Sequence, residues 1–260
     1  MLKILKYSFY DLMRSRWSYV YFIFYLLLGF VLLFLNNDVN KAVITLMNII
    51  IVLTPLIGTI FGVMYYYNSK EFTELLLAQP INRKKIFMGQ YIGISLSLTL
   101  SLVLGLGIPF VAYGLFMSSA IFDFSLLLVV GSFLNFIFVA LSYNIALSTE
   151  NKIKGFGYAI LMWLFLAVIY DGIFLISLVF FNEYPLDKFS LIATMFNPID
   201  LSRILILLKL DISALLGYTG AVFRKFFGTN LGMVLSMTVL IFWVIIPVFI
   251  MNLKLRKKDF

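Results

Sequence analysis

Residues 86–116 read IFMGQYIGISLSLTLSLVLGLGIPFVAYGLF, a run of 31 residues without a charged side chain. A helix that crosses the hydrocarbon core of a membrane needs about 20 mostly apolar residues, so this run is long enough to span it. The whole chain follows the same pattern, because 63% of its 260 residues are hydrophobic and only 12% are charged. A soluble domain carries roughly 25% charged residues, and the composition therefore predicts a protein that faces lipid.

Six apolar runs of this kind divide the chain, which predicts an all-α membrane protein with six transmembrane helices. The runs cover residues 17–35, 42–67, 86–116, 124–147, 156–181 and 231–251. Several exceed the length that a perpendicular span needs, so tilted or extended helices are expected. Residues 1–260 are predicted to form a single membrane domain.

The basic residues predict which ends of the runs face the cytoplasm. Fourteen of the 20 lysines and arginines fall in four segments that lie on one side: four before the first run, four in residues 68–85, two in residues 148–155 and four after residue 251. The short connections on the other side contain only Lys41. Short cytoplasmic loops are enriched in Lys and Arg, so both termini are expected in the cytoplasm. The net charge of +8 is thus explained without a nucleic-acid partner.

Residues 1–16 are predicted to form an amphipathic helix in the membrane interface. Basic residues occupy one face of this helix, and an apolar face lies opposite them. The apolar face consists of Leu2, Leu5, Phe9 and Leu12. The alternative is a simple helical extension of the first span.

Residues 182–230 form an outer segment between the fifth and sixth runs. It contains a further apolar run at residues 201–210, interrupted by Arg203 and Lys209. About ten residues are too few to span a membrane, so a re-entrant or interfacial helix is expected there.

The connection between the second and third runs is the most informative loop. It reads NSKEFTELLLAQPINRKKIFMGQ over residues 68–90. Ser69 is expected to cap a short helix over residues 69–80, Glu71 to favour its amino end and Pro80 to stop it.

This short helix has an apolar face in an otherwise polar loop. Phe72, Leu75 and Leu76 follow the i, i+3, i+4 spacing of one helical face. An exposed apolar patch usually marks a binding surface, and a partner is the functional interpretation. The alternative is a helix that folds back onto the membrane surface.

The loop resembles the characteristic cytoplasmic loop of ABC-2 type transporter permeases. The residues that carry the resemblance are Glu71, Phe72, Thr73, Glu74, Leu75, Leu76, Pro80, Ile81, Arg83 and Gly89. The six-span layout, the amphipathic amino-terminal helix and the basic tail extend the resemblance along the chain. It implies an ABC-2 permease fold of the type V exporter kind, in which the loop is a coupling helix that docks into a separate ATPase subunit. The contacts implied for that subunit are Glu71, Phe72, Glu74, Leu75, Leu76, Pro80 and Arg83.

A narrower resemblance lies in the outer segment, where NPIDLSRI is similar to a motif in permeases of the nitrous-oxide-reductase maturation (Nos) transporters. The agreeing residues are Asn197, Pro198, Asp200 and Arg203, together with DLMRSRW at 11–17, Asp171 and TENK at 149–152. This resemblance implies a bacterial inner-membrane location, a Nos-type ATPase subunit and a periplasmic copper-handling protein. It also implies that Asn197, Pro198, Asp200 and Arg203 dock the outer partner. The alternative for Asp200 and Arg203 is a local solvated ion pair.

Asp171 lies near the middle of the fifth run. A carboxylate at this depth costs about 2.5–3.5 kcal/mol on insertion, so it is expected to find a protein interior or a partner. It either lines a cavity between two permease copies or pins helices together. Two GxxxG pairs, Gly58–Gly62 and Gly89–Gly93, indicate close helix packing, with a dimer seam as one interpretation.

The residues that are absent narrow the chemistry. The chain has no Cys and no His and no P-loop motif, so ATP and Mg²⁺ are expected on the partner ATPase, and no metal or cofactor site is expected here. Met233 and Met237 alone make a poor copper relay.

We therefore expect a non-enzymatic permease subunit that works as a homodimer in membrane lipid. Its predicted role is to couple ATP hydrolysis to substrate export or to a conformational relay to a periplasmic partner, in copper-centre assembly. The alternatives are an ABC-2 exporter of a lipid, drug or polysaccharide-like substrate, an ion-coupled secondary transporter, and an intramembrane enzyme.

Overall fold

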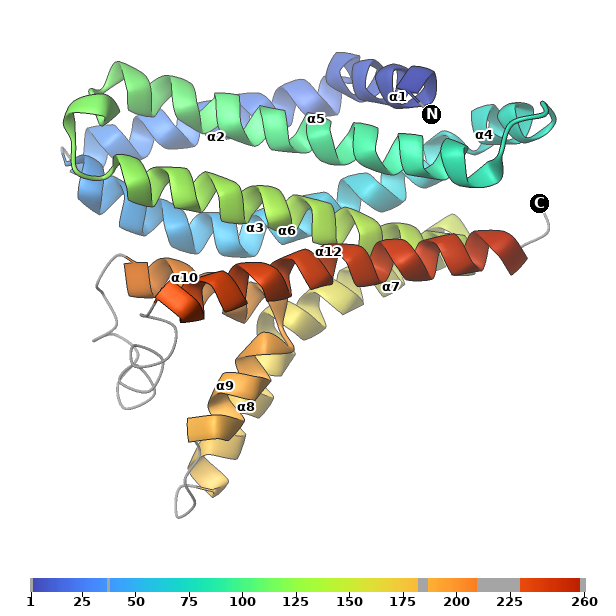
Figure 1. Cartoon of the computed structure of the whole chain (residues 1–260). Helices are drawn as coiled ribbons and strands as arrows, with labels where there is room; N and C mark the ends of the chain where they lie inside the picture. The colour runs from blue at the N-terminus through green and yellow to red at the C-terminus, as the bar shows by residue number, and fades with distance from the viewer. Residues whose placement is uncertain (1, 37, 182–186, 210–229, 258–260) are drawn as a thin grey trace.

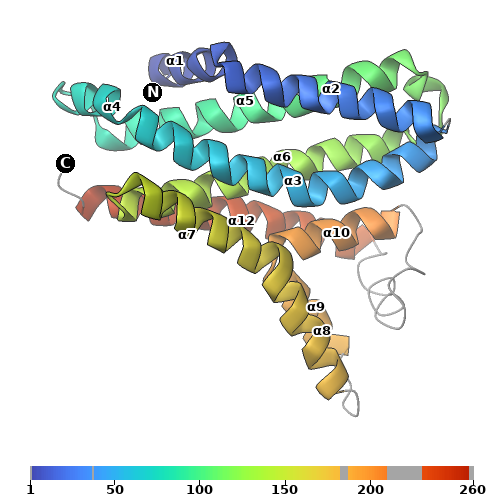
Figure 2. The same cartoon turned by 180° about the vertical axis from the view of Figure 1, so that it is seen from behind.

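The computed structural model describes residues 2–36, 38–181, 187–209 and 230–257, which form helices joined by short turns (Figures 1 and 2). Six of the helices are long and apolar enough to cross a membrane by their length and composition. No strand occurs in this part of the chain. The predicted fold class, an all-α multi-pass membrane protein, is confirmed.

Each predicted run falls largely within one of these spans. They are α2 (Arg16–Asn36), α3 (Val39–Asn68), α5 (Arg83–Ala112), α6 (Ile121–Ser148), the helix Lys152–Phe180 and α12 (Asn230–Lys257). The third run was predicted to continue to residue 116, but α5 stops at Ala112. Gly114 then adopts a φ of 88°, a left-handed conformation that favours glycine, and begins the 3-10 turn η1 (Leu115–Met117).

The fifth span is built from three pieces. α7 (Lys152–Leu164) leads into a π-helical turn, η2 (Phe165–Ile169), and α8 (Tyr170–Phe180) continues from it. Figures 1 and 2 show that α7 lies along the bundle, whereas α8 leaves it at an angle. We call this junction the elbow. A π-turn inside an α-helix is rare and is frequently found at functional sites.

The outer segment returns to the bundle as a sharply bent helix pair. α9 (Asp187–Met195) runs beside α8, and α10 (Pro198–Lys209) turns from it by 113° to lie along the bundle (Figures 1 and 2). The side chains of Leu201 and Ile206 on α10 are fully buried. This geometry is that of a re-entrant loop or a broken span and not that of a helix on the surface. Residues 182–186 and 210–229 of the segment lie outside the described part.

The amino-terminal helix α1 (Leu2–Arg14) ends before α2 begins and packs on α5, so it is not a simple extension of the first span. Its buried face differs from the predicted one, because Leu2 is 81% exposed. The buried side chains are Ile4, Ser8 and Leu12. Leu5 and Phe9 are half-buried at the edge of this face.

The two GxxxG pairs bring helices of the same subunit together. At Gly93 a β-carbon would lie 2.9 Å from the main-chain oxygen of Leu5 on α1. At Gly89 a β-carbon would be similarly close to a side chain of α1. Gly58 and Gly62 make room for α6 against α3. The pairs therefore seat α1 on α5 and α6 on α3, as small residues do in lipid. The contacts of these glycines are therefore explained within one subunit.

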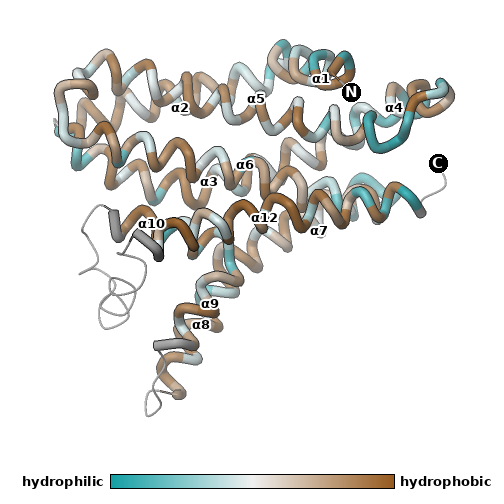
Figure 3. The backbone as a smooth tube through the Cα atoms, in the orientation of Figure 1, coloured by the Kyte–Doolittle hydropathy of each residue, from teal (hydrophilic) through white to brown (hydrophobic). Residues whose placement is uncertain are grey.

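The polar parts of the chain gather at one end of the bundle. Figures 1 and 3 place the amino terminus, α4 and the carboxyl end of α12 there, with the hydrophilic colours concentrated around them. The turn between α6 and α7 reaches the same end. The four basic segments thus share one end, as the charge pattern requires of a single side of the membrane.

Replacing Gly93 by leucine is expected to destabilise the protein, because the new side chain would push the backbone of α1 away from α5. Overpacking of this kind costs about 1–3 kcal/mol. Gly107→Leu in the same helix is the matched control, since nothing lies within 4 Å of a β-carbon built at that position. Thermal unfolding in lipid nanodiscs should give a clearly lower Tm for Gly93→Leu. Equal Tm values for the two variants would contradict the seating of α1 on this pair.

Candidate functional site

The short helix predicted between the second and third spans is present as α4 (Lys70–Leu77). Ser69 was predicted to cap it with its hydroxyl, and this is wrong, because the side chain makes no cap hydrogen bond. Thr73 closes the first turn instead, with its amide and its hydroxyl both 2.8 Å from the main-chain oxygen of Ser69. The helix ends at Leu77, before Pro80, where proline prevents continuation.

α4 is anchored to the bundle along one side. Gln90 of α5 donates a 2.8 Å hydrogen bond from Nε2 to the hydroxyl of Thr73, and both side chains are buried. The ring of Phe72 stacks on Tyr7 of α1, with 4.5 Å between the ring centroids. Leu76 is partly buried against the core. The predicted apolar face is therefore divided, since Phe72 and Leu76 are held by the subunit itself.

The other side of α4 is open. Leu75 is 67% exposed. Glu71 and Glu74 lie on the same part of the helix and are exposed, and Glu74 makes a 3.8 Å ion pair with Lys70 on the surface. Pro80 and Arg83, which follow the helix, are exposed as well. These residues form what we call the α4 outer face: Glu71, Glu74, Leu75, Pro80 and Arg83.

The junction between α3 and α4 is joined to the start of α7. The hydroxyl of Tyr67 donates to the main-chain oxygen of Thr149 at 2.7 Å, and Lys152 donates from Nζ to the side-chain oxygen of Asn68 at 2.9 Å. Tyr67 and Asn68 are the last residues of α3. These two hydrogen bonds connect the base of α4 to α7, the helix that leads to the elbow.

At the elbow, residues that the sequence suggested for two different roles form one cluster. Arg203 of α10 donates from Nη1 to Oδ2 of Asp171 at 2.6 Å and to Oδ1 of Asp200 at 3.2 Å. Asp171 comes from α8, the first turn after η2. One guanidinium therefore holds two carboxylates from two separate helices. Just over a quarter of the Arg203 and Asp171 side chains is exposed.

Asn197 completes the cluster at the break between α9 and α10. Its Nδ2 donates to the main-chain oxygen of Leu166 inside η2 and to Oδ2 of Asp200, both at 2.8 Å. Its Oδ1 accepts from the amide of Ile199 at 3.1 Å and so caps α10. Pro198 follows as the first residue of α10, a position that suits proline because no intrahelical donor is lost there.

The motif NPIDLSR is thus an internal brace between the fifth span and the outer segment. Asn197 and Asp200 are 0% and 7% exposed, and Pro198 is buried between them. Of the four residues predicted to dock an outer partner, only Arg203 keeps a larger part of its side chain, 29%, exposed in this conformation. Asp171 lies in the same brace, which favours the helix-pinning interpretation over the cavity-lining one. Among the described residues, no three His, Cys, Asp or Glu side chains could hold a metal ion together.

Several residues of these two sites were not singled out from the sequence. Gln90 and Tyr7 anchor α4, and Tyr170 donates from its hydroxyl to the main-chain oxygen of Ala193 at 2.6 Å, which ties α8 to α9. The sequence could have indicated a role for Gln90, because it is an amide side chain within an apolar run. It gave no such indication for Tyr7 and Tyr170, since aromatic residues are common at such positions.

The fold and the two sites define a class, an all-α multi-pass membrane permease with a half-anchored helix at its polar end. No family model matches the chain. The chain is 24% identical over 196 residues to the "Probable ABC transporter permease protein NosY" of Pseudomonas aeruginosa, a match that covers 68% of this chain and 67% of that protein. It is 25% identical over 140 residues to the protein of the same name from Stutzerimonas stutzeri, covering 50% of this chain and about half (49%) of the relative.

Both relatives carry the same printed name, and the resemblance to ABC transporter permeases of the NosY kind is confirmed.

Replacing Arg203 at the elbow is expected to destabilise the protein more than neutralising its partner Asp171. Arg203→Met would leave Asp171 and Asp200 facing each other without a cation, whereas Asp171→Asn keeps a hydrogen-bond acceptor for Arg203. Breaking a fully buried pair costs about 3–5 kcal/mol, and the partial exposure here lowers the expectation to about 2 kcal/mol. Tm values of the two variants and of Asp171→Asn/Arg203→Met in nanodiscs form a double-mutant cycle. Strictly additive changes would show that the two side chains are not coupled.

Proposed function

We propose that this chain is the membrane-spanning permease subunit of an ABC transporter and that it receives force from a separate ATPase subunit through α4. Two copies form the transporter, because each copy offers one α4 and an ABC transporter uses two ATPase subunits. The complex then either exports a substrate or relays a conformational change to a periplasmic partner.

The observation that carries this proposal is the two-sided character of α4. Its inner side is held by the Thr73–Gln90 hydrogen bond and by the Phe72–Tyr7 stack. Its outer side presents an exposed leucine beside two exposed glutamates. A helix that transmits force needs both a firm attachment and a side to which a partner can bind, and the two sides of α4 suit these two tasks.

Two routes lead from α4 into the membrane. One enters α5 through Gln90 and α1 through Tyr7, and α1 is itself seated on Gly89 and Gly93 of α5. The other passes through the end of α3 to α7 and ends at the elbow, where a π-turn and an ion-paired brace meet. A bent junction held by a few polar contacts is the kind of element that has two packings, and ATP binding would shift the balance between them.

The ion-coupled alternative is weakened by the elbow geometry. In the sequence, Asp171 was the only carboxylate near the middle of a predicted span that could bind and release a coupling ion. It is bound to Arg203 at 2.6 Å, and an ion-paired carboxylate is a poor site for reversible ion binding.

The downstream role that we propose is copper-centre assembly of nitrous oxide reductase, with a periplasmic copper-handling protein as the outer partner. The support is the name that both relatives carry and the NPIDLSRI and DLMRSRW motifs. The chain contains no Cys and no His, so the proposed role is mechanical and does not route copper through the spans. The brace around Asn197 would pass motion of α7 to the outer segment.

Leu75→Glu is expected to release the ATPase while the permease still inserts. The substitution places a third negative charge on the α4 outer face and removes its apolar contact, whereas the inner contacts of α4 remain. Affinity purification of the tagged permease from membranes should recover the ATPase subunit at least about tenfold less, as expected for loss of about 1.4 kcal/mol or more at an interface centre.

Met117→Glu is the matched control, because Met117 is a 98% exposed apolar residue in the turn η1, which follows the end of α5 that is remote from α4. It should leave ATPase recovery unchanged. Normal recovery and normal ATPase stimulation with Leu75→Glu would contradict force transfer through α4.

Loss of the permease is expected to lower the copper content of nitrous oxide reductase without lowering the amount of its polypeptide. The relay would act on a partner that supplies or inserts copper, not on synthesis of the enzyme. Metal analysis of the reductase purified from a deletion strain checks this, with re-expression of the wild-type chain as the control. A fully copper-loaded reductase in the deletion strain would exclude the copper role and would leave the general ABC permease role standing.

A further inference from the structure

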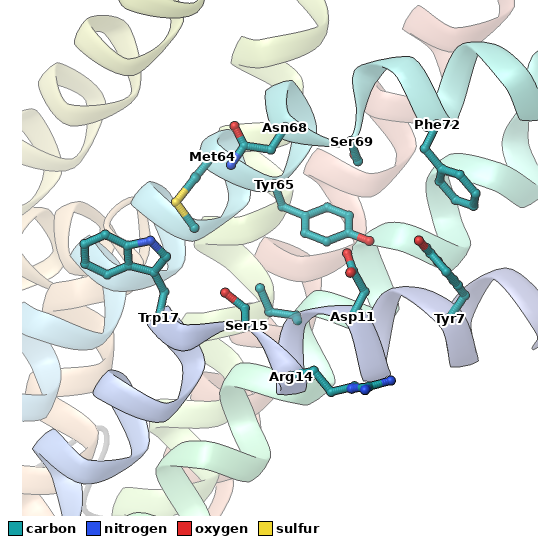
Figure 4. Close-up of a pocket in the computed structure, with 11 residues that line it drawn as sticks. Tyr7, Asp11, Arg14, Ser15, Trp17, Met64, Tyr65, Asn68, Ser69 and Phe72 are labelled. Atoms are coloured by element: carbon teal, nitrogen blue, oxygen red, sulfur yellow. The ribbon is translucent and has the colours of Figure 1, made fainter.

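A polar pocket of about 450 Å³ lies between α1, the end of α3 and the start of α4. Figure 4 shows its lining, in which aromatic rings surround a carboxylate. The residues that matter for its chemistry are Tyr7, Asp11, Arg14, Trp17, Tyr65 and Phe72. The proposed force transfer uses the stack of Phe72 on Tyr7 at the edge of this pocket and assigns no role to Asp11, Trp17 or Tyr65.

An apolar groove of about 300 Å³ lies next to the pocket, between α2 and α3. Trp17 lines both spaces, so they adjoin. On α3 the pocket begins at Met64 and the groove runs from Phe61 to Leu53, deeper in the bundle. Eight residues of helix rise about 12 Å, which is most of the half of a ~30 Å hydrocarbon core that belongs to one leaflet.

The pocket combines groups that suit a zwitterion. Asp11 supplies a negative charge, and the faces of Tyr7 and Trp17 attract cations. Arg14 also lines the pocket, and Figure 4 shows its guanidinium on the other side of α1, directed away from Asp11 and Tyr65. A purely anionic ligand would meet Asp11. A ligand that carries both an ammonium and a phosphate can place the ammonium at Asp11 and the phosphate outside the pocket, toward Arg14.

Tyr65 gives independent evidence that a polar ligand belongs here. Its side chain is 5% exposed, and its hydroxyl lies near Ser8 and Asp11 without making a well-formed hydrogen bond to either. Figure 4 shows the hydroxyl directed toward Asp11 and the hydroxyl of Tyr7, inside the pocket. A buried hydroxyl without a partner costs free energy, and a ligand group placed beside it removes that cost.

We propose that the pocket and groove together hold one phospholipid with an amine-bearing headgroup. The ammonium lies against Asp11 and the aromatic rings, the phosphate lies near Arg14, and one acyl chain lies in the groove between α2 and α3. A water-soluble zwitterion would leave the groove empty, and an acidic lipid would face Asp11. Trp17 lies at the boundary between the two spaces, where tryptophan commonly sits in membrane proteins.

The lipid would also support α4. Ser69 and Phe72 line the pocket at the base of that helix, so a bound headgroup bridges α1 and the beginning of α4. The proposal requires only that the spans lie in a bilayer, and it is independent of ATP coupling. Its failure would therefore leave the proposed function untouched.

Native mass spectrometry of the purified chain, titrated with dioleoyl-phosphatidylethanolamine or dioleoyl-phosphatidylglycerol, tests the headgroup. The wild type should prefer phosphatidylethanolamine. In Asp11→Asn this preference should fall about tenfold, as expected when a hydrogen bond to a charged group is lost. Glu150→Gln is the matched control, because Glu150 is an exposed carboxylate at the same end but outside the pocket, and it should keep the wild-type preference.

A second variant and a second ligand test the acyl chain. Leu53→Trp fills the groove and should reduce binding of phosphatidylethanolamine without changing the elution volume or the Tm of the protein. Free phosphoethanolamine should not compete with the lipid, because it cannot use the groove. An unchanged preference in Asp11→Asn, unchanged binding in Leu53→Trp, or effective competition by phosphoethanolamine would each overturn the proposal.

Discussion

Lipid surrounds this protein and offers it neither hydrogen bonds nor a strong gain from packing leucine against leucine. The spans are therefore held by close approach of backbones and by polar contacts that stay inside the protein. α5 shows the first means, because a β-carbon at Gly93 or Gly105 would collide with α1 or α2. Asn144 shows the second, since its amide donates to the main-chain oxygen of Pro247 and joins α6 to α12. These contacts between the spans fix the positions of α4 and the elbow.

α4 takes its character from these contacts. It is eight residues long, too short to be stable by itself in water. The hydrogen bond from Gln90 and the stack of Phe72 on Tyr7 hold it in place. Because those contacts use one side of the helix, Leu75 is left on the other side, exposed beside charged residues. The proposed coupling role rests on this division more than on the apolar pattern itself.

The elbow solves a related problem within the fifth span. A helix that carries Asp171 pays for a charge in a poorly polar environment, and Arg203 offsets this cost from a separate helix. Asn197 then satisfies a main-chain oxygen within η2 and fixes the turn between α9 and α10. The contacts that neutralise the charge of Asp171 therefore also set the angle of the outer segment. A change in these contacts is expected to change that angle.

The six spans, their order and a short helix within residues 69–80 were determined by the sequence, because runs of apolar residues longer than a bilayer is thick have no other stable environment. Its motifs also led to the ABC permease class. The tertiary structure alone decided which face of α1 is buried, that Ser69 does not cap α4, and that Asp171 joins Asn197, Asp200 and Arg203 in one cluster. These depend on contacts between residues far apart in the chain, and hydrophobic periodicity reports only the local environment of each helix.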